Sequence, residues 1–180
     1  MIIKPILTGL LTIGVLMSVQ ETKAIAQPAP QVLLAGNPKA SSDWIRFTSR
    51  KHGFTALMPG NSKISDRLGA VKKDWTIAGT DSDTSYSISY LEDDETTKLT
   101  DANMNKLVNH LFKQGQFEEV KRFRFTIRGY PGRESSFRGP GVTGYLRIYA
   151  VRTRLYMTIV VTRGGNERKI ADFLDSFGLF

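Results

Sequence analysis

Few residues of this chain have the type and spacing that chemistry at an active site requires. Residues 139–144, GPGVTG, match the G-x-G-x-x-G spacing of a dinucleotide-binding loop. Such a loop works by opening a helix whose N-terminal N–H groups meet the pyrophosphate. Here the β-prone run YLRIYAV follows the glycines. The pattern therefore predicts a glycine-rich connection between two strands and no nucleotide cofactor.

Carboxylates and histidines are the other candidates for chemistry. The dense acidic cluster at 92–95, EDDE, offers the oxygen ligands that calcium prefers, but it lacks the ligand spacing and turn glycine of an EF-hand loop. We interpret it as a solvated loop. The two histidines, His52 and His110, are interpreted as isolated surface residues, and the chain has no cysteine. We expect no catalytic residue, no cofactor and no metal site.

Residues 121–128, KRFRFTIR, combine positive charge with aromatic rings. A strand here would place three apolar side chains on one face: Phe123, Phe125 and Ile127. The other face would carry the arginines: Arg122, Arg124 and Arg128. Nucleic acid binding requires bases to stack on aromatics that stand beside the cations, and this strand separates the two. We therefore expect the aromatic rings to be buried and the arginines to form a solvent-facing row. This row is the candidate surface for an anionic partner, and we expect no nucleic acid binding.

The first 26 residues have the layout of a secretory signal peptide. An apolar run at 6–19 follows Lys4, and the A-x-A motif Ala24-Ile25-Ala26 predicts cleavage after Ala26. A helix of this apolar run would span about 21 Å, less than the hydrocarbon core of about 30 Å. Export to a periplasm or a thylakoid lumen is therefore expected.

The remaining chain is predicted to be one domain behind a short leader. Residues 27–42 are rich in proline and small polar residues, which predicts a flexible leader. Residues 43–180 are long enough for a single core without disulfides.

The charge is unevenly distributed in this basic chain, whose formal net charge is +8. From residue 121 onward there are twelve Lys or Arg and four acids, whereas residues 74–101 hold eight acids and one Lys. The division could orient the protein on a polyanion or an anionic membrane surface. We favour the simpler interpretation, in which these charges are the solvated faces of an ordinary domain.

Apolar periodicity predicts four strands before the first helix, at 44–47, 54–58, 75–78 and 86–90. A helical stripe follows between Met104 and Phe112, with Thr100 as the cap and Gly115 at the end.

Four more strands and a second helix are predicted in the rest of the chain. The strands are 120–128, 133–138, 145–151 and 155–161, and a helix behind Asn166 carries an apolar stripe from Ile170 to Phe177. The Arg152-Thr153 turn lacks the usual two-residue turn chemistry, so its length stays open. This order predicts an α+β sandwich, a mainly antiparallel sheet packed with two amphipathic helices.

Residues 54–60 (FTALMPG), 154–156 (RLY) and 173–177 (FLDSF) resemble segments of exported bacterial proteins that are frequent in cyanobacteria and mostly uncharacterised. The order of elements is similar to that of the PsbP-like fold, found in a lumenal accessory subunit of the photosynthetic oxygen-evolving complex. This resemblance covers about residues 44–180 and implies an accessory or assembly role, without catalytic residues to carry over. Thr153 departs from it, because these proteins usually have Gly or Asn at that position.

The sequence therefore favours an exported, non-enzymatic binding, accessory or assembly protein that acts through protein contacts, with a photosystem-related role implied by the resemblance. The sequence does not identify its partner. A small periplasmic hydrolase or a ligand-binding domain with a carboxylate site stays open as the alternative. A deep pocket with convergent polar groups would favour that alternative, and a shallow polar groove would favour a binding protein.

Overall fold

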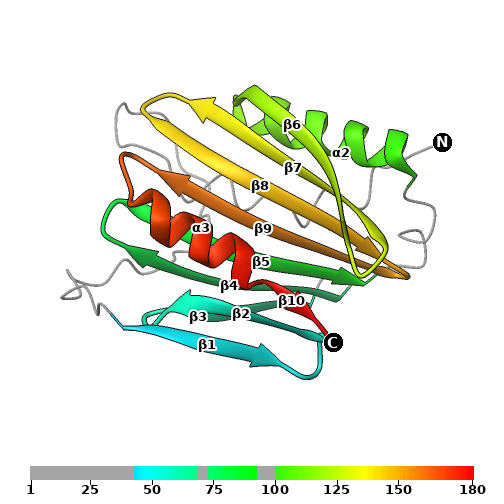
Figure 1. The fold of residues 1–180 in the computed structure, drawn as a ribbon, viewed down its shortest axis with the longest axis horizontal. Helices are drawn as coiled ribbons and strands as arrows, with labels where there is room; N and C mark the ends of the chain where they lie inside the picture. Colours follow the sequence, from blue (N-terminus) through cyan, green and yellow to red (C-terminus); the bar gives the residue numbers. More distant parts are fainter. Residues whose placement is uncertain (1–42, 69–72, 93–99) are drawn as a thin grey trace, which may run out of the picture.

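The fold is seen in a computed structural model that describes residues 43–68, 73–92 and 100–180 (Figure 1). The predicted signal peptide (1–26) and leader (27–42) lie outside these residues. Three residues of the acidic cluster, Asp93, Asp94 and Glu95, lie outside them as well. The predictions made for these segments stay predictions.

The described residues form two sheets in which every pair of neighbouring strands is antiparallel. The larger sheet has seven strands in the order β3-β4-β5-β9-β8-β7-β6. Their bounds are Lys63–Leu68 (β3), Lys73–Asp81 (β4), Thr84–Glu92 (β5), Glu118–Ile127 (β6), Tyr130–Gly139 (β7), Val142–Val151 (β8) and Arg154–Thr162 (β9). The smaller sheet has the order β1-β2-β10, with bounds Trp44–Ser49, Phe54–Pro59 and Gly178–Leu179.

The two helices of the described residues begin at the capping residues that the sequence predicts. Helix α2 (Asp101–Gly115) follows Thr100, whose side chain accepts a hydrogen bond from the backbone N–H of Asn103. Helix α3 (Glu167–Ser176) follows Asn166, whose side-chain oxygen accepts hydrogen bonds from the backbone N–H groups of Arg168 and Lys169. Each cap satisfies N–H groups that have no partner within the helix.

The helices cover opposite faces of the larger sheet, and the core is divided accordingly (Figure 1). On the α2 face, Leu107, Val108 and Phe112 pack against the apolar side chains of β7, β8 and β9. On the other face, α3 and the smaller sheet enclose a second cluster that is rich in aromatic rings. The α+β fold class with two helices and antiparallel sheets is thus confirmed.

Aromatic side chains form a continuous row across the larger sheet on its α3 face. Cross-strand register aligns five of them with one glycine, in the order Phe125, Gly132, Tyr149, Tyr156, Tyr90 and Trp75. Gly132 leaves room for the neighbouring ring, because a Cβ there would lie 2.6 Å from Cζ of Phe125. Phe177 stacks on Tyr149 with ring centroids 4.9 Å apart. The row makes β6 part of the same core as the central strands.

The structure adds two strands that the sequence pattern does not predict. One is β3, whose sequence KISDRL contains too few apolar residues to alternate clearly. The other is the two-residue β10, which pairs with β2. The Arg152-Thr153 turn has two residues, since Val151 pairs with Arg154. No described helix has the length and apolar character needed to cross a membrane.

Candidate interaction surface

The basic strand β6 is an edge strand of the larger sheet, and its apolar face is less buried than the sequence predicts. Phe125 and Ile127 are partly buried and pack on the aromatic core. Phe123 is 53% exposed and belongs to neither core cluster, so its predicted burial is wrong. A side chain on an edge strand has a strand neighbour on one side alone, which explains the exposure.

The three arginines predicted as one solvent-facing row have different surroundings. Arg122 lies under α2, where its guanidinium donates to Glu119 Oε1 at 2.5 Å, to Asn109 Oδ1 at 2.5 Å and to the Asn105 carbonyl at 3.5 Å. The prediction that Arg122 faces solvent is therefore wrong, because α2 packs over this side chain. Arg124 is exposed on the same face.

Arg128 is exposed but does not belong to the strand. It occupies the two-residue β6–β7 turn with Gly129, and both residues have positive φ, 50° and 81°. The predicted row of Arg122, Arg124 and Arg128 is thus divided between a helix contact, a strand surface and a turn. No observation tests whether any of them binds an anionic partner.

A buried polar network joins α2 to strands β6 and β7. Arg133 on β7 is 2% exposed and donates from Nε to Asn105 Oδ1 at 2.9 Å. Glu119 accepts both Arg122 Nε and the hydroxyl of Ser135. The sequence did not reveal that Arg133 is buried, because an arginine in a polar strand is normally solvent-exposed.

A second arginine, Arg147 on β8, holds the end of α3 against the sheet. Its Nε lies 2.5 Å from Glu134 Oε2, and its Nη1 contacts the Leu174 carbonyl at 2.6 Å and Asp175 Oδ1 at 2.9 Å. Its guanidinium carbon lies 6.0 Å from the centroid of the Phe125 ring. Burial alone would lower the pKa of Arg147, but the hydrogen bond with Glu134 raises it, and the net shift is upward. The group therefore stays charged.

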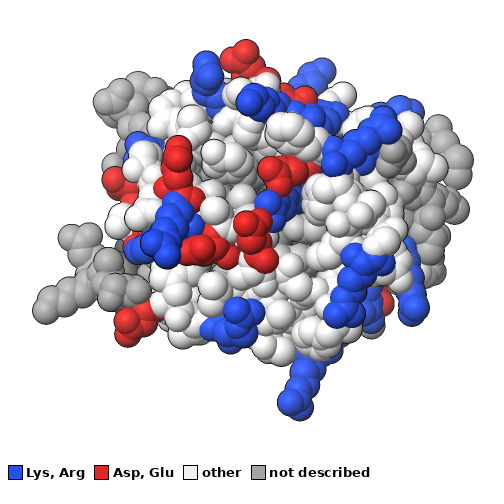
Figure 2. All heavy atoms as spheres, in the orientation of Figure 1, with Lys and Arg blue, Asp and Glu red and all other residues white. Residues whose placement is uncertain are grey.

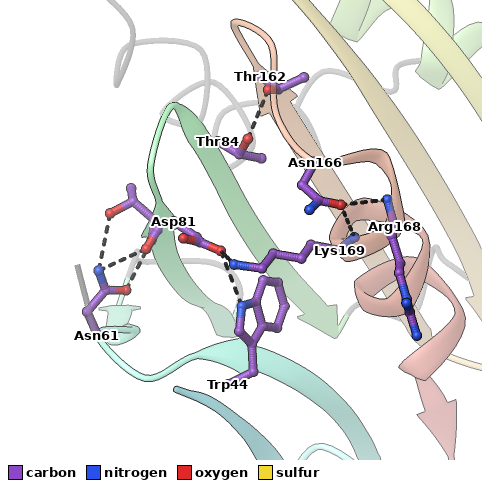
Figure 3. Close-up of polar contacts among 9 residues, drawn as sticks. Trp44, Asn61, Asp81, Thr84, Thr162, Asn166, Arg168 and Lys169 are labelled. Carbon is purple, nitrogen blue, oxygen red and sulfur yellow. Dashed lines mark hydrogen bonds and ion pairs between the residues drawn. The ribbon is translucent and has the colours of Figure 1, made fainter. Parts of the chain in front are cut away.

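A third polar centre, Asp81 at the end of β4, connects α3 to β1 (Figure 3). Lys169 Nζ lies 2.6 Å from Asp81 Oδ2, and Trp44 Nε1 donates to the same oxygen at 3.3 Å. The hydrogen bond from Lys169 lowers the pKa of Asp81 below its usual value, although burial opposes this shift. The carboxylate stays ionised, and its role in the described contacts is to join a helix and two strands.

The candidate residues for catalysis or metal binding are placed as follows. Residues 139–144 form the β7–β8 hairpin with a Pro140-Gly141 turn, as predicted for a strand connection. His52 is 7% exposed and shares a 2.8 Å hydrogen bond between its Nδ1 and Ser49 Oγ, so its prediction as a surface residue is wrong. Glu92 lies 3.6 Å from Arg154 Nε. Among the described side chains, no cluster of three or more His, Asp or Glu could hold a metal ion.

His52 also takes part in the aromatic core. Its ring centroid lies 4.7 Å from that of Trp75 and 4.6 Å from that of Tyr90, and its carbonyl accepts a hydrogen bond from the hydroxyl of Tyr156 at 2.6 Å. Burial raises the pKa of Tyr149, in the same row, to about 12. Nothing in the sequence indicates the burial of His52, because its neighbours Lys51 and Gly53 are typical of an exposed turn.

The surface of the α3 face carries charge unevenly. Charged side chains of both signs stand near its middle, and Lys and Arg side chains gather along its right-hand and lower margins (Figure 2). The margins are therefore the part of this face where positive charge is most accessible.

The fold is similar to that of a protein of known structure whose sequence identity to this chain is low. The solution structure of cyanobacterial PsbP (CyanoP) from Synechocystis sp. PCC 6803 matches with a TM-score of 0.58 and 13% identity, over 81% of this chain and 99% of that chain. This match shows that the chain has a PsbP-like fold, as the resemblance of its sequence implied.

Two further structures match more weakly. A protein of unknown function from Pseudomonas aeruginosa, PA94, has a TM-score of 0.35 and 14% identity, over 66% of this chain and 82% of that chain. A protein from Bacteroides thetaiotaomicron has a TM-score of 0.40 and 15% identity, over 75% of this chain and 48% of that chain. No protein-family model and no curated protein matches the chain.

Proposed function

We propose that this protein is an exported, non-enzymatic accessory or assembly factor that acts by binding another protein. The observation that carries the proposal is the PsbP-like fold, which matches the cyanobacterial PsbP structure over 99% of that chain. The resemblance of the sequence connects this fold with an accessory subunit of the photosynthetic oxygen-evolving complex. A photosystem-related partner is the finer form of the same proposal.

The polar chemistry of the described residues supports binding rather than catalysis. The carboxylates with the clearest geometry, Asp81, Glu119 and Glu134, are held by Lys169, Arg122 and Arg147. The Asp81–Lys169 pair joins α3 to β4, the Glu134–Arg147 pair joins β7 to β8, and the Glu119–Arg122 pair lies within β6. All three pairs therefore engage these carboxylates in the fold. Hydrolysis of a glycosidic bond would instead need two acids facing each other across a cleft. The hydrolase alternative therefore has no specific observation in its favour.

Export is tested with a reporter fusion. Residues 1–30 should direct a reporter out of the cytoplasm, and N-terminal sequencing of the mature protein should begin at Gln27. A mutant in which Leu10 and Leu11 are both replaced by Arg is the control, because charge in the apolar run should abolish export. An exported, membrane-held protein that keeps Met1 would contradict the predicted cleavage.

The binding role is tested by purification from the native membrane-enclosed compartment. The full chain, tagged after Phe180, is crosslinked in cells, isolated and separated by size, and the bound proteins are identified by mass spectrometry. We expect one partner that co-elutes in a fixed ratio. A protein that elutes as a free monomer and hydrolyses chromogenic ester or glycoside substrates would contradict the proposal and favour the enzyme.

A further inference from the structure

One end of the larger sheet displays positive charge from three separate turns. The β6–β7 turn carries Arg128, the β8–β9 turn carries Arg152, and the β1–β2 loop carries Arg50 and Lys51, all of them exposed. We call these four residues the basic end. In Figure 1 the β6–β7 and β8–β9 turns lie together at the right-hand end of the sheet.

Contacts show that the β1–β2 loop belongs to the same end. The hydroxyl of Tyr156 on β9 donates to the His52 carbonyl of that loop at 2.6 Å. A Cβ on Gly53 would lie 3.3 Å from Nη1 of Arg154, two residues after Arg152. The β6–β7 and β8–β9 turns are centred two strands apart, which corresponds to about 10 Å. The cations are therefore close enough for one extended ligand.

Two of these arginines occupy a backbone conformation that is unfavourable for their residue type. Arg128 has φ 50° and Arg152 has φ 54°, both in the left-handed region. A residue with a Cβ is disfavoured there, and hairpin turns of two residues normally use Gly, Asn or Asp at such positions. The stability of the hairpins alone would favour a different residue at both sites.

The opposite end of the sheet has small residues at its left-handed turn positions. The β4–β5 turn has Ser82 at φ 53°, and the β7–β8 turn has Gly141 at φ 68°. At the basic end, Arg128 and Arg152 share such positions with Gly53 and Gly129. Two long cationic side chains held in a disfavoured backbone conformation at the same end of the sheet indicate a role for these side chains.

The charges around the basic end narrow the choice of partner. Arg154 is 3.6 Å from Glu92, so its charge already has a counterpart. Among the described residues, Arg50, Lys51, Arg128 and Arg152 have no ion pair of this kind. Glu92 thus adds a negative charge close to the four cations. A protein segment can match charges of both signs, whereas a uniformly anionic bilayer would repel this carboxylate.

We propose that the basic end binds an acidic segment of a partner protein. This inference rests on the proposed binding function and adds the place and the chemistry of the contact. The planar guanidinium of arginine binds a carboxylate through two parallel N–H···O hydrogen bonds, which lysine cannot do. An arginine at the tip of a turn can reach such a carboxylate without displacing any core residue.

The test compares two double variants with equal changes in charge. Arg128→Asn/Arg152→Asn removes two cations from the basic end and keeps residues that tolerate the left-handed turn. The matched control, Arg138→Asn/Arg163→Asn, removes two exposed cations from the opposite end. The probe is a labelled polyglutamate peptide, and its binding is measured by fluorescence anisotropy at low and at physiological ionic strength.

We expect the first variant to weaken polyglutamate binding at least about tenfold at low ionic strength, because two charge-assisted contacts are lost. The control should change binding by less than about threefold, the effect of a lower net charge. Equal losses in the two variants, or no loss in the first, would overturn the proposal. Binding of the parent protein to phosphatidylglycerol vesicles but not to polyglutamate would overturn it in favour of a membrane surface.

Capture of the native partner separates this inference from the proposed function. If Arg128→Asn/Arg152→Asn captures the crosslinked partner as well as the parent does, the basic end is not the contact, although a binding function is still supported. If the parent captures no partner, the proposed function fails, whatever the polyglutamate result. If capture is lost in this variant and kept in the control, both proposals are supported.

Discussion

The two ends of the larger sheet share one architecture of two-residue hairpin turns, yet they differ in what the turns carry. At the end that contains Asp81, which we call the Asp81 end, polar side chains point inward and tie α3 and β1 to the sheet. Thr84 and Thr162 share a 2.9 Å hydrogen bond there. At the basic end, charged side chains project outward from strained turns. The contacts at the Asp81 end stabilise the fold. Stability does not explain the arginines in the turns of the basic end.

This difference shows how a stable core can tolerate backbone strain in surface turns. The aromatic row runs across the sheet between the two ends, and Phe54 and Phe177 pack over it. Such a core contributes enough burial to tolerate about 1 kcal/mol of backbone strain at each of two turns. The comparison can be tested by substitutions at each end, starting with the largest expected effect.

Close packing at the Asp81 end predicts the most severe change. Gly144→Ala should lower the free energy of unfolding by about 3 kcal/mol, at the upper end of the usual cost of overpacking. The reason is that a Cβ on Gly144 would collide with the ring of Phe137 and with the backbone oxygen of Val160. Urea unfolding followed by tryptophan fluorescence measures the change.

The matched control lies in a turn of the basic end. A Cβ on Gly129 would meet no atom within 4 Å, although its φ of 81° disfavours alanine. Gly129→Ala should therefore cost about 1 kcal/mol. Equal losses in the two variants would show that the Asp81 end is not the more closely packed one.

A change in the aromatic row between the two ends should have a smaller effect. Phe125→Ala should cost about 2 kcal/mol, less than the usual loss for a fully buried phenylalanine. Phe125 is partly buried, and its ring packs edge-on against Tyr149 with centroids 5.1 Å apart. Denaturant unfolding measures this loss. Phe123→Ala, at an exposed site two residues earlier, should cost about 0.5 kcal/mol, and a reversed order would contradict the assignment of strand faces.

The ion pair at the Asp81 end gives a prediction with a pH dependence. Asp81→Asn should lower stability by about 1 kcal/mol at neutral pH, a modest value because Lys169 is partly exposed. The Asp81 pKa is lowered in the folded protein, mainly by the Lys169 hydrogen bond. Its stabilising effect is therefore complete above the unfolded pKa and is lost as the pH falls through the folded pKa, below 3.8.

The measurement compares parent and Asp81→Asn in denaturant at several pH values. The two unfolding curves should differ at pH 7 and converge in strong acid, where Asp81 is protonated in both states. Lys169→Met serves as the second variant, since it keeps the alkyl chain and removes the charge. A difference between parent and Asp81→Asn that persists undiminished in strong acid would contradict the role of the ion pair.

Much of the fold could be predicted from the sequence, because periodicity reports which side of a strand or helix is apolar. The stripe from Met104 to Phe112 and the cap Thr100 identified α2, and the alternation at Tyr86, Ile88 and Tyr90 identified β5. Strand β3 was missed because its pairing with β4, rather than an apolar pattern, determines its conformation.

The surface was harder to predict, because burial of a side chain depends on elements that are distant in the sequence. Phe123 and Phe125 have the same local pattern, yet one is exposed and the other packs on Tyr149. Arg122 was expected in solvent, and α2 covers it. The positive φ of Arg128 and Arg152 could not be predicted either, since nothing in their residue type favours a left-handed turn.

The smallest effect predicted here is a gain in stability at the basic end. Arg128→Asn/Arg152→Asn should raise the free energy of unfolding by about 1 kcal/mol, because asparagine tolerates a positive φ better than arginine does. Arg138→Asn/Arg163→Asn should leave stability within about 0.5 kcal/mol of the parent. Thermal and denaturant unfolding of both variants provide the measurement. A loss of stability in the first variant would mean that the two arginines stabilise the hairpins. Their positive φ would then be no reason to assign them a role in binding.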